Sequence, residues 1–169
     1  MLNIINNLGV FFEDCYRRIN VREYSRISNV SPPTASKILF ELNKEGLLNV
    51  ERDRNYIFFY ANRESKDFID LSRMYWRGKL EELMEHLNKE LIGSTIVLFG
   101  SLAKAEVKDD SDVDIVVFSE KKDLDLSKIE RKLKRNIQLF WFDSIGAVKN
   151  KELVNNILNG YVLNGRLKI

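Results

Sequence analysis

Two acidic residues at the start of an apolar run carry the strongest chemical signal in this sequence. Asp112 and Asp114 alternate with Val113 and Ile115 where the run over residues 113–118 begins. Because side chains two apart on a strand point the same way, both carboxylates face one side of the predicted strand. Two like charges this close repel each other unless a cation lies between them. Oxygen ligands of this kind suit Mg²⁺ or Mn²⁺, which in turn bind phosphates.

A Gly-Ser pair supplies the second half of such a site. Gly100 and Ser101 directly follow the apolar run over residues 96–99. Glycine lets a backbone approach a phosphate closely, and a helix that begins at Ser101 would direct its free N–H groups toward an anion. Lys104 would add a positive point charge. The ordinary alternative is an Asp-rich surface loop beside a strand, but it leaves two aspartates inside an apolar strand without a partner.

These residues carry a family resemblance. Residues 100–115, GSLAKAEVKDDSDVDI, resemble the signature of the DNA polymerase β-like nucleotidyltransferase superfamily, and most of all its minimal archaeal and bacterial members. The matching positions are Gly100, Ser101, Ala103, Glu106, Ser111, Asp112 and Asp114. The resemblance implies an enzyme of the EC 2.7.7 type. Such an enzyme transfers a nucleoside monophosphate from a triphosphate, expected to be ATP, to a hydroxyl acceptor.

The same resemblance implies the roles of individual residues. Asp112 and Asp114 would be the catalytic pair that holds Mg²⁺ or Mn²⁺. The nucleotide-binding set would be Gly100, Ser101, Lys104 and Ser111, in which Lys104 stands where the family often has arginine. A third carboxylate is usual on a later strand, but the matching run over residues 136–142 offers Gln138 instead. Glutamine carries no charge and cannot act as a base, so turnover is in question more than nucleotide binding.

Composition limits the remaining possibilities. The 169 residues include 27 Lys and Arg against 25 Asp and Glu, so the chain lacks the strong basicity of a protein that depends on nucleic-acid phosphates. Basic residues cluster late, at Arg131, Lys132, Lys134 and Arg135, either as a solvated helix face or as a patch that steers an anion toward the cleft. Cys15 is the only cysteine, and the chain has no membrane-spanning run and no secretory signal, so we expect a cytoplasmic protein.

The front of the chain predicts a second kind of domain. Apolar periodicity predicts a helix near residues 3–16, a short strand, and a short helix over 22–27. A further helix begins after Ser31, which can cap it, with Pro32 at its first position. Strand-like runs over residues 47–52 and 56–61 then form a hairpin. This order resembles a winged helix-turn-helix over residues 1–62. We expect a connecting helix over 63–93 and then a small mixed-sheet nucleotidyltransferase domain over 94–169. The predicted fold class is therefore α+β.

Two uses of the winged helix stay open. On DNA, the second helix of the motif would enter the major groove with its N-terminal residues at base edges. Pro32 begins the exposed face of this helix. The expected DNA contacts are Pro33, Thr34, Ser36 and Lys37 on the helix and Arg52 and Arg54 on the wing. The near balance of charge over this domain predicts poor nonspecific affinity for DNA, and winged helices also serve in protein docking or homodimerisation.

Three functions therefore follow from the sequence. The first is the metal-dependent nucleotidyltransferase. The second is a winged-helix DNA-binding regulator whose degenerate nucleotidyltransferase domain only binds nucleotide, which Gln138 favours. The third is an inert scaffold that dimerises through the winged helix.

Overall fold

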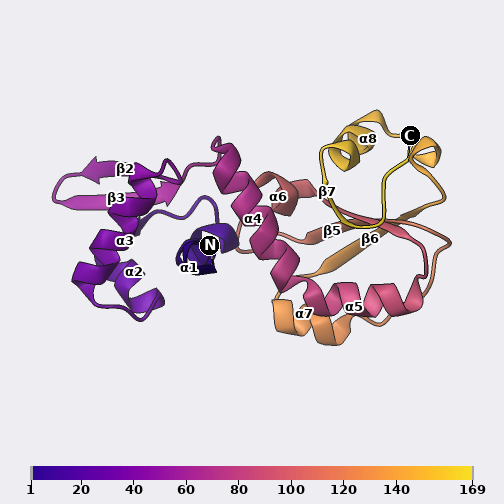
Figure 1. The fold of residues 1–169 in the computed structure, drawn as a ribbon, viewed down its shortest axis with the longest axis horizontal. Coiled ribbons are helices and arrows are strands. Elements are labelled where there is room, and N and C mark those ends of the chain that lie inside the picture. The colour runs from indigo at the N-terminus through magenta and orange to yellow at the C-terminus, as the bar shows by residue number, and fades with distance from the viewer. Residues whose placement is uncertain (1, 169) are drawn as a thin grey trace. The chain divides into compact units, whose positions relative to one another are not determined.

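The chain folds into two compact units of mixed α and β structure. The computed structural model describes residues 2–168, in which eight α-helices and two sheets are found (Figure 1). The first unit is Met1–Tyr75 together with Ala105–Asp109, and the second is Trp76–Lys104 together with Asp110–Ile169. The α+β class expected from the sequence is confirmed. In the part of the chain described, no helix is both long and apolar enough to traverse a bilayer.

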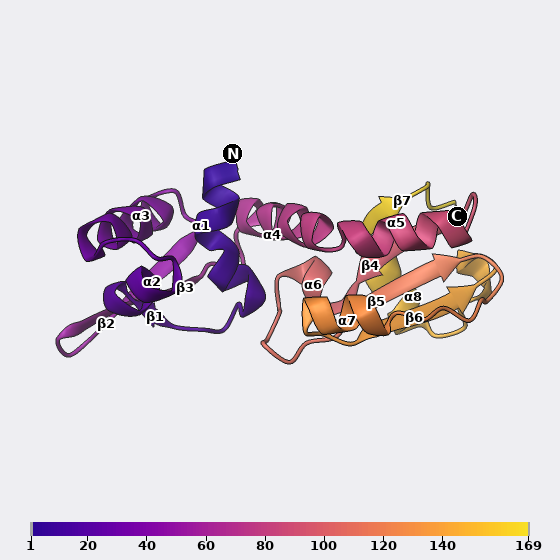
Figure 2. The ribbon, with the colours of Figure 1, turned by 90° about the horizontal axis from the view of Figure 1, so that it is seen from below.

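The first unit packs helices against one face of a small antiparallel sheet. The helices are α1 (Leu2–Glu13), α2 (Val21–Ile27) and α3 (Pro32–Lys44). The sheet has the order β1 (Ile19–Asn20), β3 (Tyr56–Ala61) and β2 (Leu48–Asp53) (Figure 2). Its core contains the buried side chains of Phe11, Tyr24, Leu39 and Phe59. The order of elements is the expected one, while the winged-helix classification stays a prediction.

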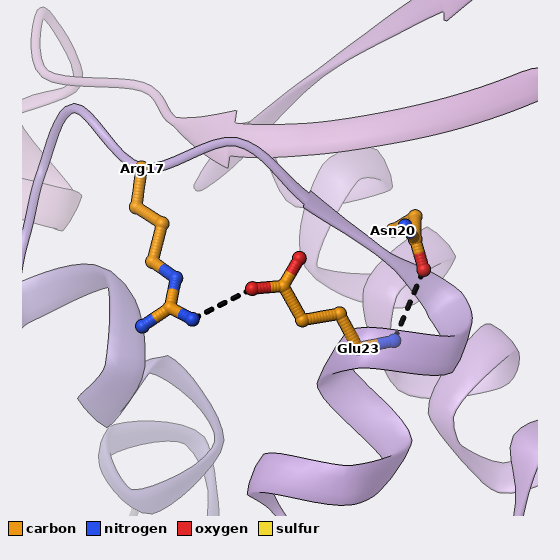
Figure 3. Close-up of polar contacts among 3 residues, drawn as sticks. All are labelled: Arg17, Asn20 and Glu23. Carbon is orange, nitrogen blue, oxygen red and sulfur yellow. Dashed lines mark hydrogen bonds and ion pairs between the residues drawn. The ribbon is translucent and has the colours of Figure 1, made fainter.

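Polar side chains fix where α2 and α3 begin. Asn20 accepts a hydrogen bond of 3.0 Å from the backbone N–H of Glu23 and so caps α2 (Figure 3). The carboxylate of Glu23 in turn lies 2.6 Å from the guanidinium of Arg17. Ser31 accepts from the N–H of Thr34 at the start of α3, and Pro32 is the first helical residue, as expected.

Two helices, not one, occupy the segment expected to connect the halves. These are α4 (Lys66–Lys79) and α5 (Glu81–Glu90), which meet at Leu80. Leu80 is fully buried and has φ −90° and ψ 8°, away from helical geometry. Gly78, which could mark a bend, lies inside α4 near its end. The division between the two units falls within α4.

The second unit is a four-stranded mixed sheet with helices on both faces. Its strand order is β6 (Ile137–Phe142), β5 (Val113–Phe118), β4 (Thr95–Phe99) and β7 (Tyr161–Asn164). Only the β5–β6 pair is parallel. In Figure 1, α5 and α7 (Ser127–Leu133) lie on one side of this sheet and α8 (Lys151–Leu158) lies on the other.

Apolar side chains on the α8 side form a core cluster that holds this layer together. Its buried members are Val97, Phe99, Val116, Val148 and Ile157. Each such side chain stabilises the fold by about 1.5–3 kcal/mol through burial. The remaining elements of this unit are α6 (Gly100–Lys104) and a single 3₁₀ turn (Ile145–Ala147). Because α6 directly follows β4, the position of that strand sets the position of the Gly-Ser pair.

Candidate nucleotide and metal site

The strand register brings both halves of the chemical motif to one end of the sheet. Asp114 is the second residue of β5 and pairs with Phe99 of β4 on one side and with Gln138 of β6 on the other. Directly paired residues point to the same face of a sheet. Asp114 and Gln138 therefore share a face, and Asp112, two residues earlier, shares it as well. Phe99 ends β4, so Gly100 begins beside the carboxylates.

Gly100 and Asp114 are in direct contact. A Cβ atom added to Gly100 would lie 2.2 Å from Asp114 Oδ2, so no other residue fits here without moving the carboxylate. Gly100 also has φ +71°, in the left-handed region where glycine is favoured. The site thus requires glycine for both its backbone conformation and its lack of a side chain.

Two amide side chains from β6 and its approach hold the carboxylate of Asp112. Gln138 Nε2 donates to Asp112 Oδ2 over 2.6 Å, and Asn136 Nδ2 donates to Asp112 Oδ1 over 3.1 Å. Each carboxylate oxygen therefore has one amide donor, which fixes the orientation of the group. Gln138 therefore lies on the same face as the two aspartates and contacts one of them directly. Asn136 was missed, although its spacing of two residues from Gln138 is the signal that could have found it.

The electrostatics of the site disfavour a second negative charge on Asp114. Burial of Asp114 raises the pKa of its carboxyl above the usual value, and the charge of Asp112 raises that pKa further. A group in this position is stabilised in its ionised form by a nearby cation. The pair is therefore a charged acceptor set that a divalent cation would complement.

Comparison with known protein families agrees with this geometry. Residues 78–163, just over half of the 169-residue chain, match the family described as nucleotidyltransferase domain. The chain belongs to this family. The match begins near the end of α4 and ends within β7, so it contains the whole aspartate and Gly-Ser arrangement. No curated protein matches the sequence significantly.

The remaining nucleotide-binding candidates of the nucleotidyltransferase domain lie on α6 and on the loop before β5. Ser101 and Lys104 are half-buried. Lys104 Nζ donates to Asn156 Oδ1 over 2.8 Å, which ties α6 to α8. The backbone carbonyl of Ser111 accepts from Arg135 Nη1 over 2.7 Å. Both contacts lie in the second unit with the aspartates.

Arg135 has a role that the sequence interpretation missed. Its side chain is only 8% exposed, and its guanidinium lies 5.1 Å from the centre of the Trp76 ring. Together with its bond to Ser111, this contact pins the loop that leads into the aspartates. The late basic cluster is therefore not a uniform solvated face, because one of its members is buried against the site. No local signal separates Arg135 from its exposed neighbours.

The chemistry of the donor set fits a divalent cation with two carboxylate ligands. Asp112 and Asp114 have carboxylate oxygens on one face, and the side-chain carbonyl of Gln138 on the same face could serve as an uncharged oxygen ligand. Within residues 2–168, His, Cys, Asp and Glu nowhere gather in threes suited to a metal ion. The site therefore has fewer anionic ligands than the family resemblance implies.

The expected DNA contacts all lie in the first unit. Five of them are exposed: Pro33, Thr34, Lys37, Arg52 and Arg54. Ser36 is half-buried on α3. Lys37 lies 3.9 Å from the carboxylate of Glu41 one turn later, and this ion pair reduces the positive potential of the helix.

Proposed function

We propose that this protein transfers a nucleoside monophosphate from a nucleoside triphosphate, ATP in the first instance, to a hydroxyl acceptor. The observation that carries the proposal is the contact of the Asp114 carboxylate with Gly100, beside Asp112 on the same face. This contact unites an anionic cation-binding pair with a backbone that a phosphate can approach closely. Membership of the nucleotidyltransferase domain family supports the same chemistry.

One group of residues would bind the cation, and another would bind the phosphates. Asp112 and Asp114 would hold Mg²⁺ or Mn²⁺, and the amides of Asn136 and Gln138 keep Asp112 in one orientation. A divalent cation, when bound, neutralises phosphate charge and favours attack at the α-phosphate. The backbone at Gly100 and Ser101 would receive the outer phosphates. Lys104, positioned by Asn156, would add a positive charge, and Ser111 would support the turn into the aspartates.

A second function is favoured by one specific observation. Gln138 occupies the register position beside Asp114 and donates to Asp112, so an amide stands where the resemblance implies a third carboxylate. A domain of this kind binds a triphosphate without turning it over. In this alternative the first unit is a winged helix. It contacts DNA through α3 and the hairpin, or it binds a second copy of the protein. Triphosphate and DNA would then change each other's affinity by the same factor.

Label transfer tests the first function. The protein is incubated with each α-labelled triphosphate, Mg²⁺ or Mn²⁺, and a cell extract that supplies acceptors, and the labelled product is identified. Asp112→Ala should abolish transfer, because the variant removes one ligand of the cation. Asp143→Ala is the matched control, since Asp143 is exposed and follows the end of β6. Equal labelling by wild type and Asp112→Ala would refute the proposal.

Binding measurements separate the second function from the first. Under the regulator hypothesis, wild type binds triphosphate with Mg²⁺, releases no pyrophosphate, and shifts a DNA probe differently with and without triphosphate. Lys37→Gln and Arg54→Gln should weaken the DNA complex while leaving triphosphate affinity unchanged. DNA mobility that does not respond to triphosphate would exclude this regulator.

A further inference from the structure

A row of aromatic rings lies on the solvent side of the sheet in the first unit. Strand β3 alternates, so that Phe59 points into the core and is fully buried, while Tyr56, Phe58 and Tyr60 point the other way. Tyr56 is 59% exposed, and the other two are half-buried. The Tyr56 and Phe58 rings lie 6.2 Å apart. This row is unusual, because the outer face of a small sheet is normally polar.

Cations lie over aromatic rings at the same face. The guanidinium of Arg18 lies 4.9 Å from the centre of the Phe58 ring, and that of Arg63 lies 4.1 Å from the centre of the Tyr16 ring. Lys108 approaches Tyr16 as well, at 5.5 Å. A guanidinium stacked on a ring is held in place and keeps its N–H edge directed outward, where it can bind phosphate.

A groove lies between these cations and Tyr60, the ring at one end of the aromatic row. Its volume is about 610 Å³, and Tyr16, Arg18, Tyr60 and Arg63 belong to its lining. Glu51 also lies in this groove and pairs with Arg18 at 3.1 Å. The groove therefore offers flat apolar surfaces and cations whose charge is partly compensated.

We infer that this face, defined by Tyr56, Phe58, Tyr60, Arg18 and Arg63, binds single-stranded nucleic acid. Unpaired bases stack on aromatic rings without regard to sequence, and the cations bind the phosphates between them. The row from Tyr56 to Tyr60 extends over roughly 13 Å, since a strand rises about 3.3 Å per residue. A mononucleotide would cover only part of this length. A duplex keeps its bases in its own stack, so the rings have nothing to receive.

This binding function is separate from nucleotidyl transfer and from the α3 contacts proposed for duplex DNA. It uses neither the aspartate pair nor the recognition residues of α3. Because Glu51 compensates part of the positive charge, stacking supplies more of the affinity than phosphate contacts do. The binding should therefore depend less on salt than binding that rests on many Lys and Arg contacts.

Fluorescence anisotropy with labelled single strands of RNA and DNA, and with a duplex of the same sequence, tests the inference. The single strands should bind more tightly than the duplex. Tyr56→Leu and Phe58→Leu should each weaken binding by about fivefold or more, the effect of losing one stacked base. Arg63→Gln should weaken it as well. The control is Phe40→Leu, which removes an aromatic ring that is 44% exposed on α3.

Three results would overturn the inference. One is a duplex affinity equal to or greater than that of the single strands. Another is wild-type affinity in both Tyr56→Leu and Phe58→Leu. Tyr56→Leu tests the face directly, because the Tyr56 side chain is largely in solvent and its replacement leaves the core intact. The third is competition by free mononucleotides as effective as that by the oligonucleotide. Asp112→Ala should bind the strand like wild type, so failure of the transfer reaction leaves this result unaffected.

Discussion

Gln138 Nε2 donates a 2.6 Å hydrogen bond to Asp112 Oδ2, and Gln138 itself pairs with Asp114 across two parallel strands. One residue of β6 is thereby bonded to one carboxylate of the site and lies beside the other in the strand register. It holds Asp112 in place without adding negative charge, which a carboxylate at the same position would do. The residue at position 138 therefore determines whether this face carries two or three carboxylates.

Gln138→Glu should make stability depend strongly on divalent cations. Without a cation, the third negative charge repels Asp112 and Asp114 and should lower the free energy of unfolding by about 1 kcal/mol. With Mg²⁺ or Mn²⁺, the variant should gain more stability than wild type, because a cation bound only by the folded state stabilises it. Thermal unfolding with and without the cation measures both effects.

The control for this variant is Asn88→Asp, which adds a negative charge at an exposed position of α5. Its stability should not respond to the cation more than that of wild type. If Gln138→Glu and Asn88→Asp behave alike, the face is not a cation site.

Gly100→Ala should disable the site by displacing Asp114. The new Cβ would lie 2.2 Å from Asp114 Oδ2, so the carboxylate must turn away from its position. Affinity for the divalent cation should fall by about tenfold to a hundredfold. The positive φ adds a strain of about 1–2 kcal/mol. Isothermal titration with Mn²⁺ and thermal unfolding are the measurements.

Gly46→Ala separates strain from displacement. Gly46 has φ +73°, close to that of Gly100, but a Cβ there would meet nothing within 4 Å. This variant should lose a similar amount of stability and bind Mn²⁺ as wild type does. A loss of Mn²⁺ affinity in both variants would show that Asp114 is not the cause.

The raised pKa of Asp114 predicts the pH dependence of stability. The folded state binds the Asp114 proton more tightly than the unfolded chain does, in which the pKa of this carboxyl is 3.8. Stability from this group is therefore present below pH 3.8 and declines as the pH rises through the raised pKa. Asp114→Asn should be more stable than wild type at neutral pH, and the difference should vanish in acid.

Urea unfolding across this pH range provides the test. Asp112→Asn removes the neighbouring charge, so the pH range over which wild-type stability declines should become narrower in that variant. Parallel pH profiles for wild type and Asp114→Asn would contradict the assignment of this decline to Asp114.

Local signals in the sequence predicted most of the elements near the site. The expected strand over residues 56–61 is β3, and the apolar run over 113–118 is β5, because period-two alternation and long apolar runs are local properties. The cap at Ser31 was also predicted, since it depends on residues three apart. The same alternation placed Asp112 and Asp114 on one face, and the strand register pairs Asp114 with Gln138, the residue that the family resemblance singled out.

Long-range contacts were beyond such reasoning. The bond between Lys104 and Asn156 joins residues 52 apart, and Asn136 reaches Asp112 from 24 residues away. The segment Ala105–Asp109 belongs to the first unit, where the carbonyl of Val107 accepts from the N–H of Cys15. None of these contacts leaves a periodic pattern in the sequence, because each depends on how distant elements pack.

The turn between α8 and β7 should tolerate no side chain at Gly160. A Cβ there would lie 2.6 Å from the backbone oxygen of Leu98 and 2.8 Å from Val97 Cγ1, both in β4. Because β4 is a central strand, Gly160→Ala must displace β7 or α8, and overpacking of this kind costs about 1–3 kcal/mol.

Gly78→Ala is the opposite case, since a Cβ at this exposed position of α4 meets nothing within 4 Å. That variant should gain up to about 1 kcal/mol from helix propensity. Urea unfolding of the two variants should therefore move in opposite directions from wild type, and a shared direction would show that contact with β4 is not what excludes a side chain at Gly160.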